Sequence, residues 1–315
     1  MQRILVTGGA GFIGSHTVDL LLANNLQVVV LDNLISGNLA YLNLAHPNLK
    51  WVEGDILDSQ LLFTAMQDCD AVLHLAALPS VPKSIEDPIA SLKVNMQGFV
   101  NVLQVLRQLK TPIRLVYASS AAVYGNSTHL PCHDEENGLF EAALSPYALE
   151  KANNERYAKL YDDLFGIKAL GLRYFNVYGL RQDPHSPYAG VISKFIERYQ
   201  QDEPITIFGS GKQSRDFIHV SDVARANLLA LQSPYSGILN IATGEAENLL
   251  NLIHYMEAAS HKKAQVVFAP ARAGDVPQSY AATDKAAAHL KFRYEMSLQQ
   301  GIHSLLEIGY HSAPY

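Results

Sequence analysis

The chain has 315 residues, and its 24 Lys and Arg against 30 Asp and Glu give a formal net charge of −6. This balance argues against a nucleic-acid-binding protein, which normally carries a basic excess on its binding face. Hydrophobic residues at 48% and charged residues at 17% make a globular composition that can bury a sizeable core.

The first half of the chain alternates short apolar runs with longer helical patterns. Val28–Leu31 is an uninterrupted apolar run, which is typical of a strand buried on both faces. Strands that alternate with helices indicate βαβ units, so we predict an α/β fold with a Rossmann-type, doubly wound parallel sheet. The predicted strands are Arg3–Thr7, Leu26–Leu31, Trp51–Glu53, Ala71–Leu75, Ile113–Ala118 and Lys168–Arg173. The helices between them are predicted at about Gly11–Asn24, Ser59–Gln67, Pro88–Lys110 and Tyr147–Phe165.

The alternation ends after Arg173. We predict a helix at Val191–Gln201, a strand at Ile205–Phe208, and a helix at Ser221–Gln232 capped by Ser221 or Asp222. A strand at Ile238–Ile241 is expected to return to the main sheet. These patterns predict a dinucleotide-binding domain of residues 1–174, to which 214–241 returns. A smaller α/β C-terminal substrate domain comprises 175–213 and 242–315.

Other features of the sequence exclude several classes of protein. The first strand runs directly into a glycine loop, so no signal peptide is predicted. No segment reaches the roughly 18 consecutive apolar residues of a membrane span. Cys69 and Cys132 cannot form a disulfide framework and lack metal-ligand spacing, so we predict no metal site. We therefore expect a cytoplasmic protein.

The glycine loop, Thr7–Gly14, lies between the first predicted strand and helix. It contains G-x-G-x-x-G at Gly9, Gly11 and Gly14, and also G-x-x-G-x-x-G starting at Gly8. In either register, glycines permit a tight turn and let backbone N–H groups reach a pyrophosphate at the helix N-terminus. The pattern alone is weak, but its position at the first strand–helix turn makes it a stronger sign of dinucleotide binding.

Asp32 ends the second predicted strand, near the spacing of about 20 residues expected for an acid that binds the adenosine ribose. A carboxylate there repels a 2′-phosphate and favours NAD over NADP. The alternative is that Asp32 and Asn33 simply start a turn, but loop and acid together favour the cofactor. Asp55, in Gly54-Asp55-Ile56 after the third strand, is placed near the adenine, although by itself it is only a strand-end acid.

Three residues suggest acid–base chemistry. Ser120 follows a strand end, where ligands bind in open α/β sheets, and Tyr147 and Lys151 are neighbours on one helix face. A free Tyr has a pKa of about 10, and an adjacent ammonium stabilises its phenolate. Tyr-x-x-x-Lys is common by chance and Ser-Ser is often a turn. The order of loop, acid, serine and Tyr/Lys on successive βα units favours catalysis.

These residues together resemble an extended short-chain dehydrogenase/reductase, and within that group a nucleotide-sugar 4-epimerase of the UDP-galactose/UDP-N-acetylglucosamine type. The resemblance covers nearly the whole chain. Its markers are Thr7–Gly14, Asp32-Asn33, Ser36-Gly37-Asn38, Leu75-Ala76-Ala77, Ser119–Gly125, Tyr147, Lys151, Arg173–Gly179, Gly209–Asp222 and Arg272-Ala273-Gly274-Asp275.

The resemblance implies NAD as the cofactor and a redox-neutral inversion at C4. Ser120 and Tyr147 would bracket the substrate O4, and Lys151 would hold the nicotinamide ribose and tune Tyr147. Tyr147 takes the O4 proton while C4 passes a hydride to NAD, and the 4-keto sugar turns about its diphosphate and receives the hydride on its other face. The residues implied for NAD are Gly8, Gly11, Phe12, Ile13, Gly14, Asp32, Asn33, Ser36, Gly37, Asn38, Asp55, Ile56, Leu75, Ala76, Ala77, Asn95, Tyr147, Lys151 and Tyr174.

On the substrate side, the resemblance places Asn176, Arg215 and Arg272 near the diphosphate and Asp275 near the uridine ribose. Guanidinium groups suit phosphates through paired hydrogen bonds. Without the flanking motifs, either arginine would be an ordinary surface or interdomain residue. The residues aligned with the uracil pocket are Val191, Thr206 and Phe208, the last of which is otherwise as well explained as a core aromatic.

Sugar choice depends on fewer residues. In the family, a small residue shortly after the Arg-x-Gly-Asp motif admits an N-acetyl group, whereas a bulky aromatic excludes it. Our register puts Ser279 at this gate, and a one-residue slip would put Tyr280 there instead. Gln182 and Ser80 also resemble members that handle N-acetylhexosamines. The hypothesis is interconversion of UDP-GlcNAc and UDP-GalNAc, with UDP-Glc and UDP-Gal as further substrates.

Other functions stay open. Dehydratases and decarboxylases of this superfamily place a carboxylate beside the active-site Ser or Thr, whereas Ala121 and Ala122 follow Ser120 here. A UDP-glucuronate 4-epimerase needs few changes, and Lys83 has no assigned role. A non-enzymatic NAD-binding regulator is the alternative of a different class, against which the complete catalytic set argues.

The long helices also bear on assembly. Leu92, Met96, Phe99 and Leu103 form one possible apolar stripe, which on sequence alone is more often intramolecular core than interface. The resemblance favours a homodimer in which two such helices from each subunit form a four-helix bundle.

Overall fold

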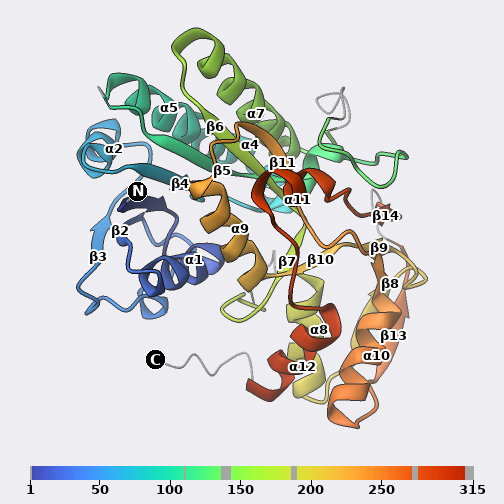
Figure 1. Ribbon diagram of the computed structural model, residues 1–315. Coiled ribbons are helices and arrows are strands. Elements are labelled where there is room, and N and C mark those ends of the chain that lie inside the picture. Colours follow the sequence, from blue (N-terminus) through green and yellow to red (C-terminus); the bar gives the residue numbers. More distant parts are fainter. Residues whose placement is uncertain (1, 110, 136–142, 186–189, 272–275, 309–315) are drawn as a thin grey trace.

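The computed structural model describes residues 2–109, 111–135, 143–185, 190–271 and 276–308 (Figure 1). Its centre is a seven-stranded sheet in which every neighbouring pair is parallel. The first six strands have the spatial order of a Rossmann fold, with a seventh added at one edge. In spatial order the strands are β11 (Gly237–Ile241), β6 (Ala169–Tyr174), β5 (Arg114–Ser120), β4 (Ala71–His74), β1 (Arg3–Thr7), β2 (Gln27–Asp32) and β3 (Leu49–Glu53).

Helices cover both faces of this sheet (Figure 1). On one face, α1 (Phe12–Ala23) and α9 (Val220–Gln232) pack on the strands and on each other, with core residues such as Val18 and Val223. On the other face, α2 (Ser59–Met66), α5 (Gly98–Gln108) and α7 (Pro146–Phe165) bury Leu62, Phe99 and Tyr161. Helices therefore shield both faces of the sheet from solvent, as its apolar strands require.

The rest of the chain forms a smaller lobe with its own core. There β8 (Ile205–Phe208) pairs with β13 (Val266–Ala269), and α10 (Leu249–Ser260) packs on α12 (Leu298–Ile308). The lobe also contains α8 (Val191–Gln200), whose Ile192 and Ile196 lie in that core. Short strands join the two lobes: β7 (Asn176–Tyr178) with β10 (Phe217–His219), and β9 (Ser214–Arg215) with β12 (Glu247–Asn248) and β14 (Gln278–Ser279).

The chain crosses between the lobes more than once. After the smaller lobe begins, α9 and β11 return to the main sheet. Helix α11 (Asp284–Leu290) does the same, because Ala286, Leu290 and Phe292 lie in the core shared by β11 and α9. The described part of the segment after Ile241 therefore contributes to both cores.

The predicted fold class is confirmed, and the predicted strands and helices are found within a few residues of their expected ends. Two details are wrong. The helix α9 is capped by His219, whose Nδ1 accepts from Ser221 N, and not by Ser221 or Asp222. Asp222 instead accepts from the N–H groups of Glu295 and Met296, which tie it to a distant loop.

The predicted helix Pro88–Lys110 is also interrupted. It divides into α4 (Pro88–Leu92), a π-helical turn η2 (Lys93–Gln97) and α5. The extra residue of a π turn rotates the helix faces on either side relative to each other. Consequently Phe99 and Leu103 are fully buried, Met96 is partly buried and Leu92 is 54% exposed, so the four do not form one stripe. No helix in the described ranges is long and apolar enough to span a membrane.

Candidate active site

The glycine loop makes the turn from β1 into α1. A Cβ on Gly14 would lie 2.1 Å from the carbonyl oxygen of Gly8, so no side chain fits there. Gly8 has φ of +71°, and a Cβ added to it would lie 2.7 Å from the Ala76 backbone nitrogen. Gly11 is the N-cap residue of α1, and no side chain caps that helix. The first N–H groups of α1 are therefore arranged as an anion cradle, which fits a cofactor pyrophosphate.

Acidic and amide side chains organise the next strand ends. Asp32 is 8% exposed, and its carboxylate accepts from Ala10 N at 3.0 Å and Leu34 N at 2.8 Å. Asn33 donates to Asp55 at 3.0 Å, which joins the ends of β2 and β3. The first of these bonds ties Asp32 to the glycine loop, and both carboxylates lie at the carboxyl edge of the sheet, where dinucleotides bind.

The other residues expected at NAD lie around this edge. Asn38 donates its backbone N–H to Ala10 O and caps the short helix η1 (Leu39–Tyr41). Asn95 clasps the loop after β4, accepting from Leu78 N at 2.8 Å and donating to Leu78 O at 3.2 Å. Tyr174 is buried and donates its hydroxyl to Asn227 of α9. Phe12, Ile13, Gly37, Leu75, Ala76 and Ala77 are partly buried, Ser36 is exposed and Ile56 is buried.

Ser120, Tyr147 and Lys151 come together from two elements. Ser120 ends β5 and caps the short helix η3 (Ala121–Tyr124) by accepting from Ala122 N. Tyr147 and Lys151 lie on the first turns of α7. Lys151 Nζ donates at 2.9 Å to the carbonyl oxygen of Ala118, which lies two residues before Ser120 on β5. Its ammonium lies 5.7 Å from the centre of the Tyr147 ring.

Burial dominates the titration of this group. It raises the pKa of Tyr147 to about 12, although a hydrogen bond with Ser120 opposes the rise and the Glu150 charge adds to it. Burial lowers the pKa of Lys151 to about 8, against the charges of Glu150 and Glu155. The sequence predicts that Lys151 lowers the phenol pKa, whereas in the structure the desolvation of Tyr147 is the largest influence on it.

The described residues expected at the substrate belong to both lobes and to the short strands between them. Asn176 donates to Asp216 O, and Arg215 of β9 donates to Ser214 O. Ser80 caps the helix α3 (Val81–Glu86) by accepting from Lys83 N at 3.0 Å. Val191 begins α8, and Thr206 and Phe208 are alternate residues of β8, all three partly buried. Arg272 and Asp275 lie outside the described residues.

Two polar groups here bear on the sugar pocket. β14 pairs in parallel with β9, and Ser279 is the register partner of Arg215. Register partners in a parallel pair point their side chains to the same side of the sheet, so the side chain of Ser279 lies on the side of Arg215. The side chain of Gln182 donates to Val177 O at 3.2 Å, and its carbonyl oxygen is buried without a partner in the described structure.

Comparison with known proteins shows the family of this chain. Residues 4–242 match the model of the NAD dependent epimerase/dehydratase family. The chain belongs to this family. The expected membership, that of an NAD-dependent nucleotide-sugar epimerase, is thereby confirmed, and so are its enzyme class and cofactor.

Three solved structures resemble the whole chain. A UDP-N-acetylglucosamine 4-epimerase from Methanobrevibacter ruminantium, in complex with UDP-N-acetylmuramic acid, has a TM-score of 0.92 at 35% identity over 97% of both chains. A UDP-glucose 4-epimerase from Thermus thermophilus, in complex with NAD, has a TM-score of 0.87 at 37% identity over 99% of this chain and 100% of that one. A UDP-glucuronic acid 4-epimerase from Bacillus cereus, with NAD and a 4-deoxy-4-fluoro analogue of its substrate, has a TM-score of 0.87 at 31% identity over 98% of both.

Sequence reasoning missed one buried carboxylate next to the substrate residues. Asp216 is fully buried and accepts from Thr243 N, Thr243 Oγ1 and Gly244 N at 2.7–2.8 Å, and from Ala281 N at 3.3 Å. Burial raises its pKa. Its own backbone N–H donates to Ser279 O, so it fixes Arg215 and Ser279 side by side. Its only sequence signal was its place within the Gly209–Asp222 motif.

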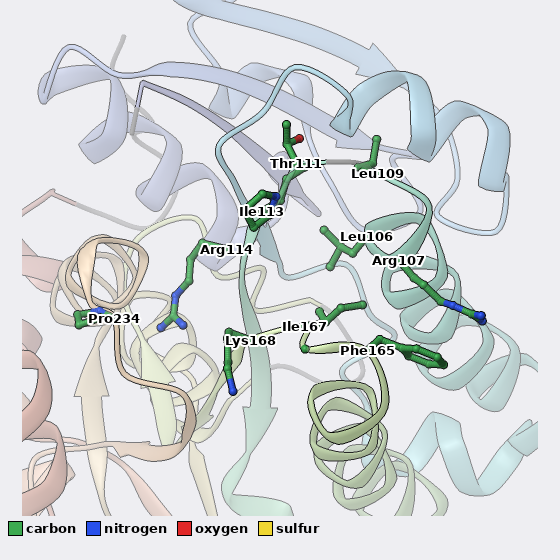
Figure 2. Close-up of a pocket in the computed structure, with 12 residues that line it drawn as sticks. Leu106, Arg107, Leu109, Thr111, Ile113, Arg114, Phe165, Ile167, Lys168 and Pro234 are labelled. Atoms are coloured by element: carbon green, nitrogen blue, oxygen red, sulfur yellow. The ribbon is translucent and has the colours of Figure 1, made fainter.

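A cavity of about 470 Å³ lies at the opposite, amino edge of β5 and β6 (Figure 2). Three cations, Arg107, Arg114 and Lys168, are among its lining residues, and the side chain of Arg107 points away from the other two (Figure 2). Arg114 donates to Ala230 O, and Lys168 is paired with Asp162 at 2.7 Å. None of the expected site residues lines this cavity, so we assign it no part in the chemistry.

Proposed function

We propose that this enzyme reversibly inverts C4 of a UDP-hexose through a 4-keto sugar. The observation that carries the proposal is the convergence of Ser120, Tyr147 and Lys151 at the carboxyl edge of the sheet, the edge that also carries the glycine loop. NAD supplies a hydride acceptor that becomes the donor for the return step. The same residues serve both directions, because the starting and inverted sugars share one ketone.

The protein groups then have distinct tasks. Tyr147 exchanges the O4 proton, and the Ser120 hydroxyl, hydrogen-bonded to it, orients that oxygen. Lys151 holds positive charge near the phenol and is itself fixed by Ala118 O. Ala121 and Ala122 follow Ser120 and can carry no proton, which disfavours an elimination or decarboxylation at this site.

The sugar we propose is UDP-GlcNAc or UDP-GalNAc, with UDP-Glc and UDP-Gal as further substrates. The shared side of Ser279 and Arg215 supports a small residue at the pocket wall. The buried carbonyl oxygen of Gln182 lacks a donor among the described groups, and an acetamido N–H is a donor of the right kind. We propose the expected NAD and substrate residues in their expected roles, Arg272 and Asp275 included.

A hexuronate substrate is the second candidate. It would need a cation for the sugar carboxylate, and Lys83 was the residue without a role. Its ammonium lies 3.3 Å from Glu86 on the surface of α3. This pairing favours an uncharged hexose.

Kinetics on the three substrate pairs test the proposal. We expect turnover of UDP-GalNAc at a rate at least comparable to that of UDP-Gal, and little turnover of UDP-glucuronate. Turnover of UDP-Gal without turnover of UDP-GalNAc would refute the N-acetyl assignment. Inactivity toward every UDP-hexose would refute the 4-epimerase proposal itself.

We also propose that the enzyme is a homodimer. Ile85 and Ile89 of α3 and α4 are 61% and 75% exposed, and on the adjacent α7 Leu160 and Leu164 are 48% and 61% exposed. We call this surface the α4/α7 face. Large exposed apolar patches mark interaction sites, and two such pairs of helices make a four-helix bundle.

A further inference from the structure

One carboxylate joins the elements that carry the catalytic groups. Glu155 lies on α7 one turn beyond Lys151, on the same helix face. Its Oε1 accepts from Ser119 Oγ at 2.5 Å and from Arg173 Nε at 2.9 Å, and its Oε2 accepts from Arg173 Nη2 at 2.7 Å. Ser119 and Arg173 are register partners on β5 and β6. The carboxylate therefore connects α7 to two strands at the residue before Ser120.

The arginine extends this connection behind the site. Arg173 Nη1 donates to the hydroxyl of Tyr124 at 2.7 Å, and that hydroxyl donates to Asn240 of β11 at 2.7 Å. The side chains of Arg173 and Glu155 are only 4% and 10% exposed. Burial alone would lower the pKa of Arg173, but Glu155 and Tyr124 raise it, so the guanidinium keeps its charge inside the protein. Such a satisfied, desolvated pair holds its geometry rigidly.

The position of this network matters because the catalytic groups come from different elements. Ser120 belongs to β5, whereas Tyr147 and Lys151 belong to α7. Only two side-chain bonds in the described structure join β5 and α7 immediately before Ser120, namely Lys151 to Ala118 O and Ser119 to Glu155. Lys151 also has a catalytic task, so the Ser119–Glu155 bond is the one free to act purely as a support.

We propose that Ser119 and Glu155 are positioning residues that set the separation of the Ser120 and Tyr147 hydroxyls. The inference rests on the proposed 4-epimerase function only in its kinetic test, which needs a substrate that the enzyme turns over. Neither residue contacts the reacting oxygen, and both act by holding β5 against α7. Catalytic rates respond steeply to errors of about 1 Å in such arrangements.

Ser119→Ala is the variant that tests this. It removes one hydroxyl, and Glu155 Oε1 keeps its bond from Arg173 Nε. Removing Glu155 itself would leave Arg173 buried without a counter-charge and would disrupt folding. Ser119→Thr restores the hydroxyl. Tyr199→Phe is the control, because it too removes a partly buried hydroxyl with hydrogen bonds, to Lys262 O at 2.7 Å and to Ser260 Oγ, in the smaller lobe.

We expect Ser119→Ala to lower kcat about tenfold with KM for the UDP-sugar and bound NAD per chain unchanged. Ser119→Thr should recover most of the rate, and Tyr199→Phe should lower the melting temperature without lowering kcat. A purely structural role for Ser119 predicts loss of stability alone, with wild-type kcat per NAD-loaded chain, and that result would overturn the inference.

A crystal structure of Ser119→Ala provides a readout independent of the reaction. We expect a Ser120 Oγ to Tyr147 Oη separation longer than in wild-type protein crystallised alongside it. An unchanged separation would overturn the inference even if the wild-type enzyme proved inactive on every UDP-hexose. In that case the function proposal fails, and the positioning role is decided by the structure.

Discussion

Ile89→Arg tests the proposed dimer most directly. Ile89 is 75% exposed in the single chain, the largest exposed fraction among the large apolar side chains of the described structure. Fully burying an Ile contributes about 1.5–3 kcal/mol, and a twofold interface buries two copies. Burial of the exposed part would then contribute about 3 kcal/mol to dimerisation, or roughly 100-fold in Kd. An arginine at this position loses the contribution of Ile89 burial and adds the cost of desolvating two charges.

Light scattering coupled to gel filtration, at low micromolar concentration, measures the outcome. We expect wild-type protein to elute with the mass of two chains and Ile89→Arg with the mass of one. Val267→Arg is the control, because Val267 is 50% exposed on β13, away from the α4/α7 face. A wild-type monomer, or an Ile89→Arg dimer that dissociates no more readily than wild type, would refute the reasoning.

Three further predictions concern the site. Tyr147→Phe should lower kcat by roughly 10²–10⁴-fold while bound NAD is retained, as measured by turnover and by absorbance. Gly14→Ala should destabilise the fold by about 1–3 kcal/mol or more and abolish bound NAD, because its Cβ would lie 2.1 Å from Gly8 O. Gly11→Ala is the control, because its Cβ would meet only Gly8 O at 3.3 Å, and it should unfold in urea near the wild-type midpoint. Burial lowers the pKa of His74 to about 3, so this group's stabilising contribution is complete above the unfolded pKa of about 6.5 and is lost as pH falls toward 3. At pH 5 the loss is about 2 kcal/mol relative to pH 7.5, and urea unfolding of His74→Gln, which lacks this titration, should show a correspondingly smaller decrease.

The parts of the molecule that were predictable from sequence are those set by local pattern. The buried run Val28–Leu31 and the glycines of Thr7–Gly14 each have a short-range physical reason, and both lie where expected. The π turn at Lys93–Gln97 had no such signal. Within this turn Asn95 O accepts from the side chain of Asn154 of α7, and no window along the sequence contains both residues.

The supporting carboxylates were unpredictable for the same reason. Glu155 reads as an ordinary acid on a helix, and its role depends on Arg173, 18 residues away, and on Ser119, 36 residues away. Asp216 receives its donors from Thr243, Gly244 and Ala281. Buried polar groups are satisfied mainly by such long-range partners, so their partners become visible only when the chain is folded.

The titration of the catalytic pair shows why positioning and charge must act together. With the pKa of Tyr147 raised to about 12 and that of Lys151 lowered to about 8, burial opposes both charges of a phenolate–ammonium pair. The pKa of Tyr147 therefore has to fall before its phenol can act as a base near neutral pH. Each unit by which the phenol pKa must fall requires about 1.4 kcal/mol of differential stabilisation. Such stabilisation can come only from charges and hydrogen bonds held close to the oxygen, since attraction weakens with distance. A support that holds Ser120 against Tyr147 therefore contributes to base strength as well as to geometry.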